Sequence, residues 1–339
     1  MSRRGVPARG AVVGRPPDRG QQLKDTPVRV PGMNARSVAG GLAAGVGVTA
    51  LANAALRRRA PPLDPALGGT QHTFEWRDID VQYAEAGDPE DPDLVALPGI
   101  NAAGSNGEFR RVFDDLAADF HVVSPDLPGF GTSERPPLRY SASLYTEFVR
   151  DFLGTFESPA VVASSLTGAY LLDVAADLDL SSVALICPTE RGGPDRITAL
   201  RELLRAPVVG EALFNLLTSK PSIRYFNADH GYYDPDRVSD EWTDYEWQTA
   251  HQPNARYAPA SFISGFLNAD VDLEAELRSL DAPVTLVWGR EADIVPLRRG
   301  RDLAEAADCR LVVVDDAKLL PHVEFPEQVL EVLDGALER

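Results

Sequence analysis

Short apolar runs alternate along the chain with longer segments whose apolar residues recur every three or four positions. The short runs predict strands, and the helical period predicts amphipathic helices. Because strands alternate with helices, we expect an α/β fold with a doubly wound, mostly parallel sheet and an antiparallel pair at one edge. Strands are predicted at residues 73–76, 80–84, 94–97, 122–126, 182–187, 284–288 and 310–314, and in the run that starts at Pro159; helices are predicted at 108–118, 143–156 and 297–307, after Ser165, and from Pro326.

The strand rhythm stops between residues 191 and 280, where the sequence is mainly helical in pattern and rich in aromatic residues. This insertion divides the predicted sheet domain into residues 71–190 and 281–337. An insertion past the middle of such a sheet is where a helical cap would cover a site at the strand ends. We expect most of its aromatic side chains to pack the insertion itself.

The first seventy residues have a different character from the rest. Residues 1–36 are rich in Arg, Pro and Gly, which predicts a disordered basic leader, and Met33 offers an alternative start to Met1. Residues 37–56 are uncharged and end at three arginines, which leaves a membrane anchor, a cleaved signal or a soluble leader open. Those arginines favour a cytoplasmic body, with membrane association through 37–56 as one alternative. Residues 61–69 are a predicted linker.

Charge limits the possible partners. The chain has a net charge of -18, but residues 61–339 carry 22 basic against 49 acidic residues, a net charge of -27. Such a body would repel nucleic acid, which argues against nucleic acid as its partner. Only three of the 33 basic residues are lysine. Adaptation to high salt and a high-GC genome both explain this composition.

No cysteine or histidine cluster has the spacing of a metal site, and we expect neither a metal nor another cofactor. Cys187 and Cys309 lie in apolar, strand-like runs and are predicted core residues. The histidines are far apart in the sequence (His72, His121, His230, His251 and His322).

The stretch around Ser165 joins an apolar strand-like run to a helix-forming run. A nucleophilic serine in such a sharp turn needs small neighbours, because the strand and helix backbones pass close to its Cβ. Ala163, Thr167 and Gly168 occupy those positions. At the start of the helix, the amide of Leu166 would point toward an oxyanion on an attacked carbonyl. A structural strand-to-helix junction is the alternative interpretation.

Together with this turn, three further stretches resemble the α/β-hydrolase superfamily, over nearly all of residues 71–337. The turn Leu-Pro-Gly-Ile at 97–100 is similar to the one that supplies a second oxyanion amide, here that of Ile100. Residues 126–133 resemble the family's structural Asp-x-x-Gly-x-Gly-x-Ser turn. The loop 288–296 resembles the one with the catalytic acid, which implies that role for Asp293, with Glu190 as a lesser candidate.

The family's third catalytic residue has no direct counterpart. Aligned on Pro321, Glu324 and Pro326, the usual histidine position holds Leu319, and His322 follows three residues later. The order Ser165, Asp293, His322 is still that of the fold.

The resemblance implies a hydrolase that acts on an ester-like or other small acyl substrate through Ser165, with His322 as base and Asp293 as its orienting acid. Two alternatives stay open, because a fold hosts several functions. One is a non-catalytic member that binds a ligand or partner. The other is a lyase on the same scaffold.

Overall fold

The computed structural model describes residues 35–337, and their side chains from Val46 onward. The predicted leader up to residue 34, with both start methionines, lies outside the described residues. Residues 35–44 begin helix α1 (Ala35–Arg59), and the chain from residue 45 forms the unit described below. None of the helices in the described part of the chain combines the length and apolarity of a bilayer-spanning segment.

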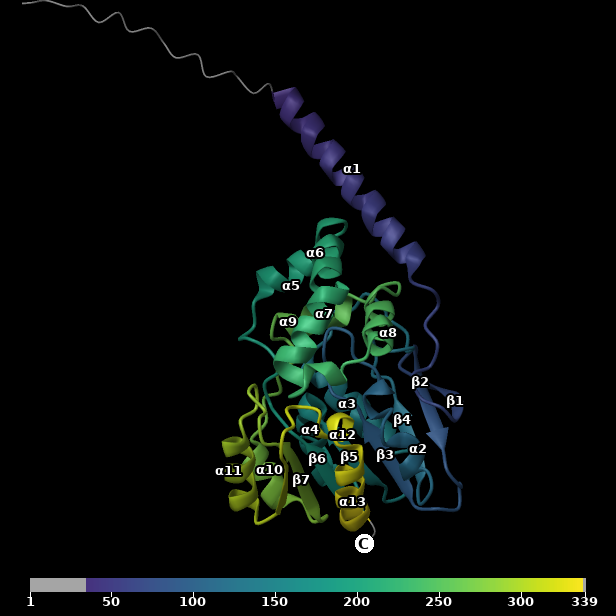
Figure 1. The fold of residues 1–339 in the computed structure, drawn as a ribbon, viewed down its shortest axis with the longest axis vertical. Coiled ribbons are helices and arrows are strands. Elements are labelled where there is room, and N and C mark those ends of the chain that lie inside the picture. Colours follow the sequence, from purple (N-terminus) through teal and green to yellow (C-terminus); the bar gives the residue numbers. More distant parts are fainter. Residues whose placement is uncertain (1–34, 338–339) are drawn as a thin grey trace, which may run out of the picture. The chain divides into compact units, whose positions relative to one another are not determined.

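Eight strands form one sheet in the order β1-β2-β4-β3-β5-β6-β7-β8 (Figure 1). β1 pairs with β2 and β2 with β4 in antiparallel fashion, and all other neighbours are parallel. This confirms the predicted mostly parallel sheet with an antiparallel edge. The strands are β1 (Thr70–Trp76), β2 (Ile79–Ala86), β3 (Asp93–Leu97), β4 (His121–Pro125), β5 (Ala160–Ser164), β6 (Ser182–Ile186), β7 (Val284–Gly289) and β8 (Arg310–Val314).

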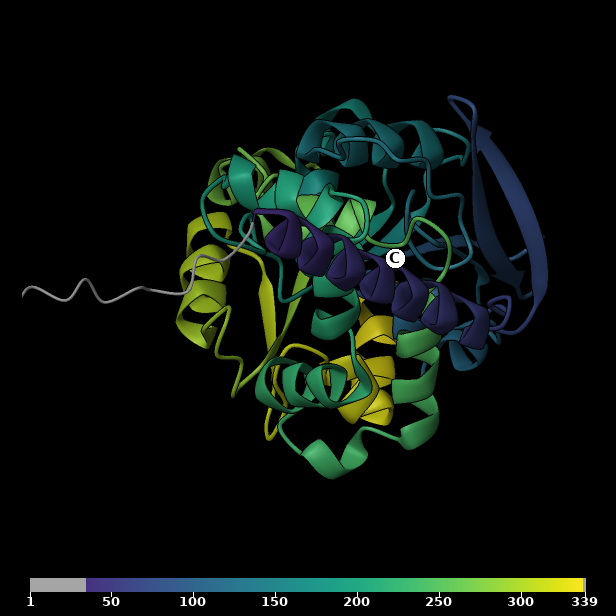
Figure 2. The ribbon, with the colours of Figure 1, turned by 90° about the horizontal axis from the view of Figure 1, so that it is seen from above.

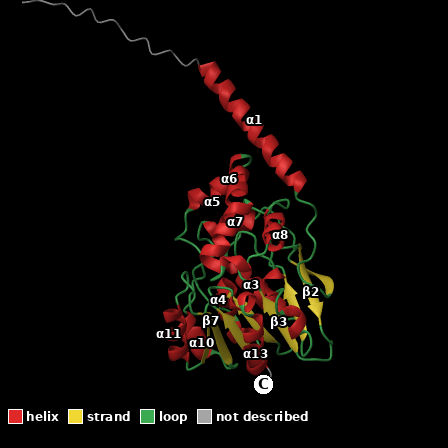
Figure 3. Ribbon diagram, in the orientation of Figure 1, coloured by secondary structure: helices red, strands yellow, loops and turns green. Residues whose placement is uncertain are grey.

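Helices cover both faces of the sheet (Figure 3), which explains why its central strands are continuously apolar. Along β5, Val161 and Ala163 join one hydrophobic core, whereas Ala160 and Val162 join the other. The first core contains residues from α3 (Ala142–Leu153), α4 (Ser165–Leu172), α10 (Leu273–Ser279) and α11 (Leu297–Ala307). The second contains residues from α2 (Phe113–Leu116) and α13 (Pro326–Leu337).

The chain between β6 and α10, residues 187–272, is called the inserted segment below. In Figure 1 its helices, in teal and green, gather beyond one end of the strands, and Figure 2 views the molecule from that end. They are α5 (Thr198–Arg205), α6 (Val209–Leu217), α7 (Lys220–Phe226), the π-helix η3 (Asn227–Gly231), the 3-10 turn η4 (Pro235–Arg237), α8 (Asp240–Ala250) and α9 (Tyr257–Ile263). Although the sequence grouped residues up to 280 with the insertion, α10 packs against α4 and α11 beside the sheet.

The prediction of one helix over residues 108–118 is wrong. That region holds a 3-10 turn, η1 (Asn106–Phe109), and the single α-helical turn of α2. The start of η1 is fixed by the amide of Asn106, which donates to Asp126 Oδ1 at 2.7 Å. The side chain of Glu108 turns inward to the amide of Gly99. These buried polar contacts override the amphipathic pattern, because leaving such groups unpaired would cost more than a few helical bonds.

Candidate active site

Ser165 occupies the sharp turn that its neighbours predicted. β5 ends at Ser164, α4 begins at Ser165, and Ser165 has a φ of 53°. A left-handed conformation costs a non-glycine residue about 1–3 kcal/mol, so the surrounding packing must hold it. Ala163 is fully buried, and a Cβ on Gly168 would already lie 3.3 Å from the Cβ of Pro188. A small residue at 168 therefore lets α4 pack closely against the end of β6.

Thr167 departs from the family's usual glycine, and the structure gives a reason. Its hydroxyl donates to the carbonyl of Pro98 at 2.6 Å, in a fully buried contact. Pro98 belongs to the turn after β3 that was predicted to supply the second oxyanion amide. The threonine thus ties the first turn of α4 to this neighbouring turn.

The turn at Gly99 lies directly against Ser165. A Cβ at Gly99 would be 3.3 Å from the Cβ of Ser165 and 3.1 Å from Glu108 Oε2, so this close approach requires glycine. The amide of Gly99 donates to Glu108 Oε2 at 2.8 Å. The next residue, Ile100, is buried beside it. The predicted oxyanion residues Ile100 and Leu166 therefore belong to two turns that meet at Ser165.

The turn at residues 126–133 is built as a structural motif. The Asp126 carboxylate accepts from the amides of Asn106 and Thr132 and from the Thr132 hydroxyl. Burial raises the pKa of Asp126, although these hydrogen bonds oppose the shift. Ser133 is buried, with its hydroxyl 2.6 Å from the carbonyl of Asp126 and 2.8 Å from the amide of Gln82. The Ser133 hydroxyl is therefore occupied by two hydrogen bonds to the backbone.

His322 lies in the short helix α12 (Pro321–Glu324) and is fully buried. Its Nε2 is 3.3 Å from Glu108 Oε1, and its ring centre is 5.4 Å from that of Phe109. The ring is not aligned for a good hydrogen bond to the carboxylate, and neither of its nitrogens has a hydrogen-bond partner among the described residues. The imidazole and the Glu108 carboxylate nevertheless form a close, buried pair.

Glu108 is the site residue that the sequence did not reveal. Burial alone would raise the pKa of Glu108, but the His322 imidazole, the Ser164 hydroxyl and the Gly99 amide outweigh it and hold the pKa below its ordinary value. The carboxylate is therefore ionised at neutral pH. No local motif pointed to it, because its neighbours come together only through the fold.

Asp293, the predicted acid, follows β7 in a different environment. Its side chain is 71% exposed, and its Oδ2 lies 3.4 Å from Lys318 Nζ. The lesser candidate, Glu190, has its Oε1 3.7 Å from Arg299 Nη2. The structure thus places His322 next to Glu108 and places Asp293 next to Lys318.

The loop before α12 contacts the inserted segment. Lys318 Nζ is 2.6 Å from the carbonyl of Asp229 and 3.4 Å from that of Ala228, both in η3. Leu319, at the family's histidine position, is half-buried against the first core. Glu324 Oε1 accepts from the amides of Tyr233 and Asp234. The loop before α12 and α12 itself, which carries His322, are therefore each joined to the inserted segment.

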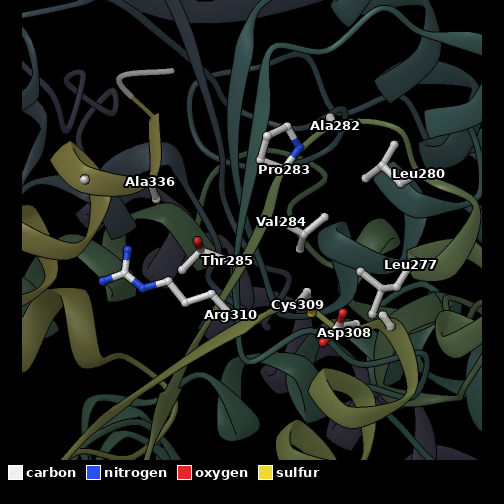
Figure 4. A pocket seen from close by; sticks show the side chains of 12 residues that line it. Leu277, Leu280, Ala282, Pro283, Val284, Thr285, Asp308, Cys309, Arg310 and Ala336 are labelled. Atoms are coloured by element: carbon white, nitrogen blue, oxygen red, sulfur yellow. The ribbon is translucent and has the colours of Figure 1, made fainter.

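A cavity of about 370 Å³ lies elsewhere, at the opposite end of the strands (Figure 4). Val284 and Arg310, which line it, begin β7 and β8 respectively. Ser165 and Asp293 both follow the carboxyl ends of their strands, where ligands bind in open α/β sheets. The cavity is therefore separate from the candidate active site.

Comparison with known proteins agrees with this architecture. A family model described as "Alpha/beta hydrolase family" matches residues 94–332, and the chain belongs to this family. It is 24% identical over 279 residues to 2-hydroxy-6-oxo-6-(2'-aminophenyl)hexa-2,4-dienoic acid hydrolase of Metapseudomonas resinovorans, covering 77% of this chain and 88% of that protein. A match to an uncharacterised hydrolase of Saccharomyces cerevisiae is 39% identical over 66 residues, 19% of this chain and 22% of that one.

Among solved structures, 2-hydroxy-6-oxo-6-phenylhexa-2,4-dienoate hydrolase from Rhodococcus sp. strain RHA1 is similar with a TM-score of 0.64. The two chains are 24% identical, and the match covers 80% of this chain and all of that one. This structural likeness shows a shared fold. Family membership and the named relatives support hydrolase activity in general.

Proposed function

We propose that the protein is a serine hydrolase that cleaves an ester-like or other small acyl substrate through an acyl-enzyme on Ser165. The observation that carries the proposal is the left-handed φ of 53° at Ser165, between a buried strand and the first turn of α4. A strained residue of this kind persists only where its surroundings enforce it, and such residues cluster at active sites. The same conformation presents the hydroxyl of a nucleophile at the end of the sheet.

In the proposed reaction, Ser165 Oγ attacks the substrate carbonyl carbon while its proton passes to His322. The amides of Ile100 and Leu166 stabilise the oxyanion of the tetrahedral intermediate. The C–O bond to the leaving group then breaks, and His322 returns the proton to that oxygen. Water hydrolyses the acyl-serine by the same two proton transfers, which regenerates Ser165 and releases the acid.

We further propose that the inserted segment acts as a cap over this site. Support comes from its contacts with the loop that carries His322, through Lys318 and Glu324. A cap excludes water from the reacting atoms and shapes the substrate pocket. The choice of substrate would then depend on the inserted segment.

One specific observation favours a rival function. Leu319 occupies the family's histidine position, and Lys318 engages the predicted acid Asp293. A member that lost catalysis but kept the cap and pocket would bind a ligand without turning it over. This rival differs from the proposed hydrolase in what happens at Ser165.

Hydrolysis of p-nitrophenyl acetate by the purified chain separates the two functions. We expect activity in the wild type and a loss of more than about 10³-fold in Ser165→Ala and in His322→Ala, because members of such a catalytic group act as a unit. The histidine controls His230→Ala and His251→Ala should change the rate by less than about threefold, under roughly 0.7 kcal/mol of barrier.

A different pattern would support the rival. If the wild type is inactive and Leu319→His gains esterase activity, the natural protein is a binding member of the family. If His322→Ala retains the rate within about tenfold, roughly 1.4 kcal/mol, His322 is not the base.

A further inference from the structure

We propose that Glu108 is the positioning residue that holds and polarises His322, in the role that the sequence had assigned to Asp293. The inference rests on the proposed function, since it concerns the base of that reaction. It begins from the closest charged contact of the imidazole: Nε2 of His322 lies 3.3 Å from Oε1 of Glu108. An imidazole that accepts a proton becomes a cation, and a nearby buried carboxylate stabilises it.

Glu108 is held in place from a second direction. While Oε1 faces His322, Oε2 accepts the amide of Gly99 at 2.8 Å, and the Ser164 hydroxyl also bonds the carboxylate. Gly99 and Ser164 flank Ser165 in space and in sequence respectively. The carboxylate therefore connects the predicted oxyanion turn, the nucleophile turn and the imidazole. A group fixed in this way can orient the ring without reorganising during the reaction.

Burial strengthens the contact. The side chains of His322 and Glu108 are 0% and 10% exposed, so water screens their interaction little. When His322 gains a proton, its imidazole becomes positively charged. The ionised carboxylate of Glu108 beside it then compensates that charge. The pair is thus suited to the moment when His322 holds the serine proton.

Asp293 lacks each of these features. Its side chain is 71% exposed, and Lys318 Nζ lies 3.4 Å from its carboxylate. Lys318 is itself fixed by the carbonyl of Asp229 at 2.6 Å. Water and the Lys318 ammonium group both screen the charge of such an exposed carboxylate, which weakens its effect on any other group.

The pairing with Glu108 involves only one of the two ring nitrogens of His322. Both ring nitrogens of His322 are buried without a hydrogen-bond partner among the described residues, and Nε2 is the one within ion-pair distance of Glu108, 3.3 Å from Oε1. Buried polar atoms without partners are rare in native proteins and point to a functional or an unseen partner. With Nε2 facing Glu108, Nδ1 is the nitrogen left to accept the proton of Ser165. In the usual catalytic triad Nδ1 faces the acid and Nε2 accepts the serine proton; here the two nitrogens exchange these roles.

The test compares two carboxylate-to-amide variants of the full chain, Glu108→Gln and Asp293→Asn, in hydrolysis of p-nitrophenyl acetate. We expect Glu108→Gln to lower kcat by about 10²- to 10⁴-fold with KM changed less than threefold, because the amide cannot compensate the imidazolium. Glu108→Asp should recover part of kcat. Asp293→Asn should stay within about threefold of the wild type. The reverse ranking of the two variants would overturn the inference.

Proton NMR gives a readout that needs no turnover. The inference predicts that in solution the His322 ring turns its Nε2–H onto Oε1 of Glu108, which lies 3.3 Å away. A carboxylate bonded to an imidazole N–H moves that proton far downfield, so the wild type and Asp293→Asn should both show such a resonance, assigned by its loss in His322→Ala. Glu108→Gln should lack it. Absence of the resonance in the wild type, or its loss in Asp293→Asn, contradicts the inference even if Glu108→Gln does not fold.

The two proposals fail in different ways. If Ser165→Ala keeps the wild-type esterase rate, the proposed function is wrong, and the downfield resonance still reports on the pair of Glu108 and His322. If Ser165→Ala and His322→Ala are inactive but Glu108→Gln retains kcat, the serine hydrolase stands and the role of Glu108 is wrong.

Discussion

Glu246 is a carboxylic acid buried in α8 of the inserted segment, and the proposed reaction does not use it. Its Oε2 accepts from Asn227 Nδ2 at 2.6 Å. Burial raises the pKa of Glu246 to about 7, although Asn227 and Arg110 oppose the shift. In the unfolded chain the same group titrates near its ordinary value of about 4.3. The folded state therefore binds more protons than the unfolded state between these two values, and Glu246 makes the protein less stable as pH rises through this window.

We expect Glu246→Gln to relieve this penalty at high pH. Each pKa unit corresponds to about 1.36 kcal/mol, so the gain in unfolding free energy should be about 2 kcal/mol larger at pH 8 than at pH 5.5. Urea titrations at the two pH values measure the difference. Glu241→Gln, on the exposed side of the same helix, is the matched control and should show no such pH dependence. Equal gains for Glu246→Gln at both pH values would show that this acid is not buried in its neutral form.

At the residue scale, the sequence located Ser165 but not Glu108. Ser165 is recognisable because the pattern of a strand-to-helix turn is local: an apolar strand run, small residues on both sides of the serine and a helix-forming run lie within a dozen positions. The pairing of Glu108 with His322 joins residues more than two hundred positions apart, through the docking of η1 against α12. The sequence placed Glu108 only at the start of a predicted helix, and no local motif marked it as a site residue.

At the scale of elements, Lys318 and Glu324, on either side of His322, contact the inserted segment through opposite charges. Lys318 contacts carbonyls of Ala228 and Asp229 in η3, whereas Glu324 accepts amides from Tyr233 and Asp234 just beyond it. A cation at carbonyls and a carboxylate at amides is the favourable arrangement at each end of such a turn. The contact should resist separation of the inserted segment from the loop.

We expect Lys318→Met to loosen this contact. Loss of a charge-assisted hydrogen bond costs about 1.5 kcal/mol, so amide hydrogen exchange over residues 227–234 should be roughly tenfold faster. Lys220→Met removes a lysine from the same segment, where it pairs with Asp244 at half-exposed positions, and should leave exchange at 227–234 unchanged. Unchanged exchange in Lys318→Met would mean that Glu324 and packing alone hold the segment.

The strands were more predictable than the helices near the site. β8 and α11 begin and end where the pattern placed them. α11 buries Leu297, Gly300 and Leu303 along one face, as its helical period requires, and β8 is a continuous apolar run after Arg310. The pattern did not predict the structure of residues 106–116, since buried contacts of Asn106 and Glu108 divide this region into two short turns. Local periodicity is reliable where packing follows it, and fails where a polar network fixes the backbone.

At the scale of the whole molecule, charge dominates. Residues 61–339 carry a net charge of -27, which makes their compact state repel itself. Salt screens this repulsion, since the Debye length falls from about 10 Å at 0.1 M to about 3 Å at 1 M. We expect the purified protein to melt at a higher temperature in 1 M KCl than in 0.1 M KCl, by differential scanning calorimetry. An unchanged or lower melting temperature would argue against an adaptation to high salt and for a composition set by the genome.

The proposed function depends above all on Ser165 being a nucleophile that His322 activates. The most direct measurement is labelling with a fluorophosphonate, which traps an activated serine as a stable adduct, followed by mass spectrometry of the modified peptide. We predict a single adduct on Ser165, no adduct in Ser165→Ala, strongly slowed labelling in His322→Ala, and wild-type labelling in the exposed-serine control Ser143→Ala. An adduct that persists in Ser165→Ala, or a wild-type protein that is not labelled at all, would contradict the account.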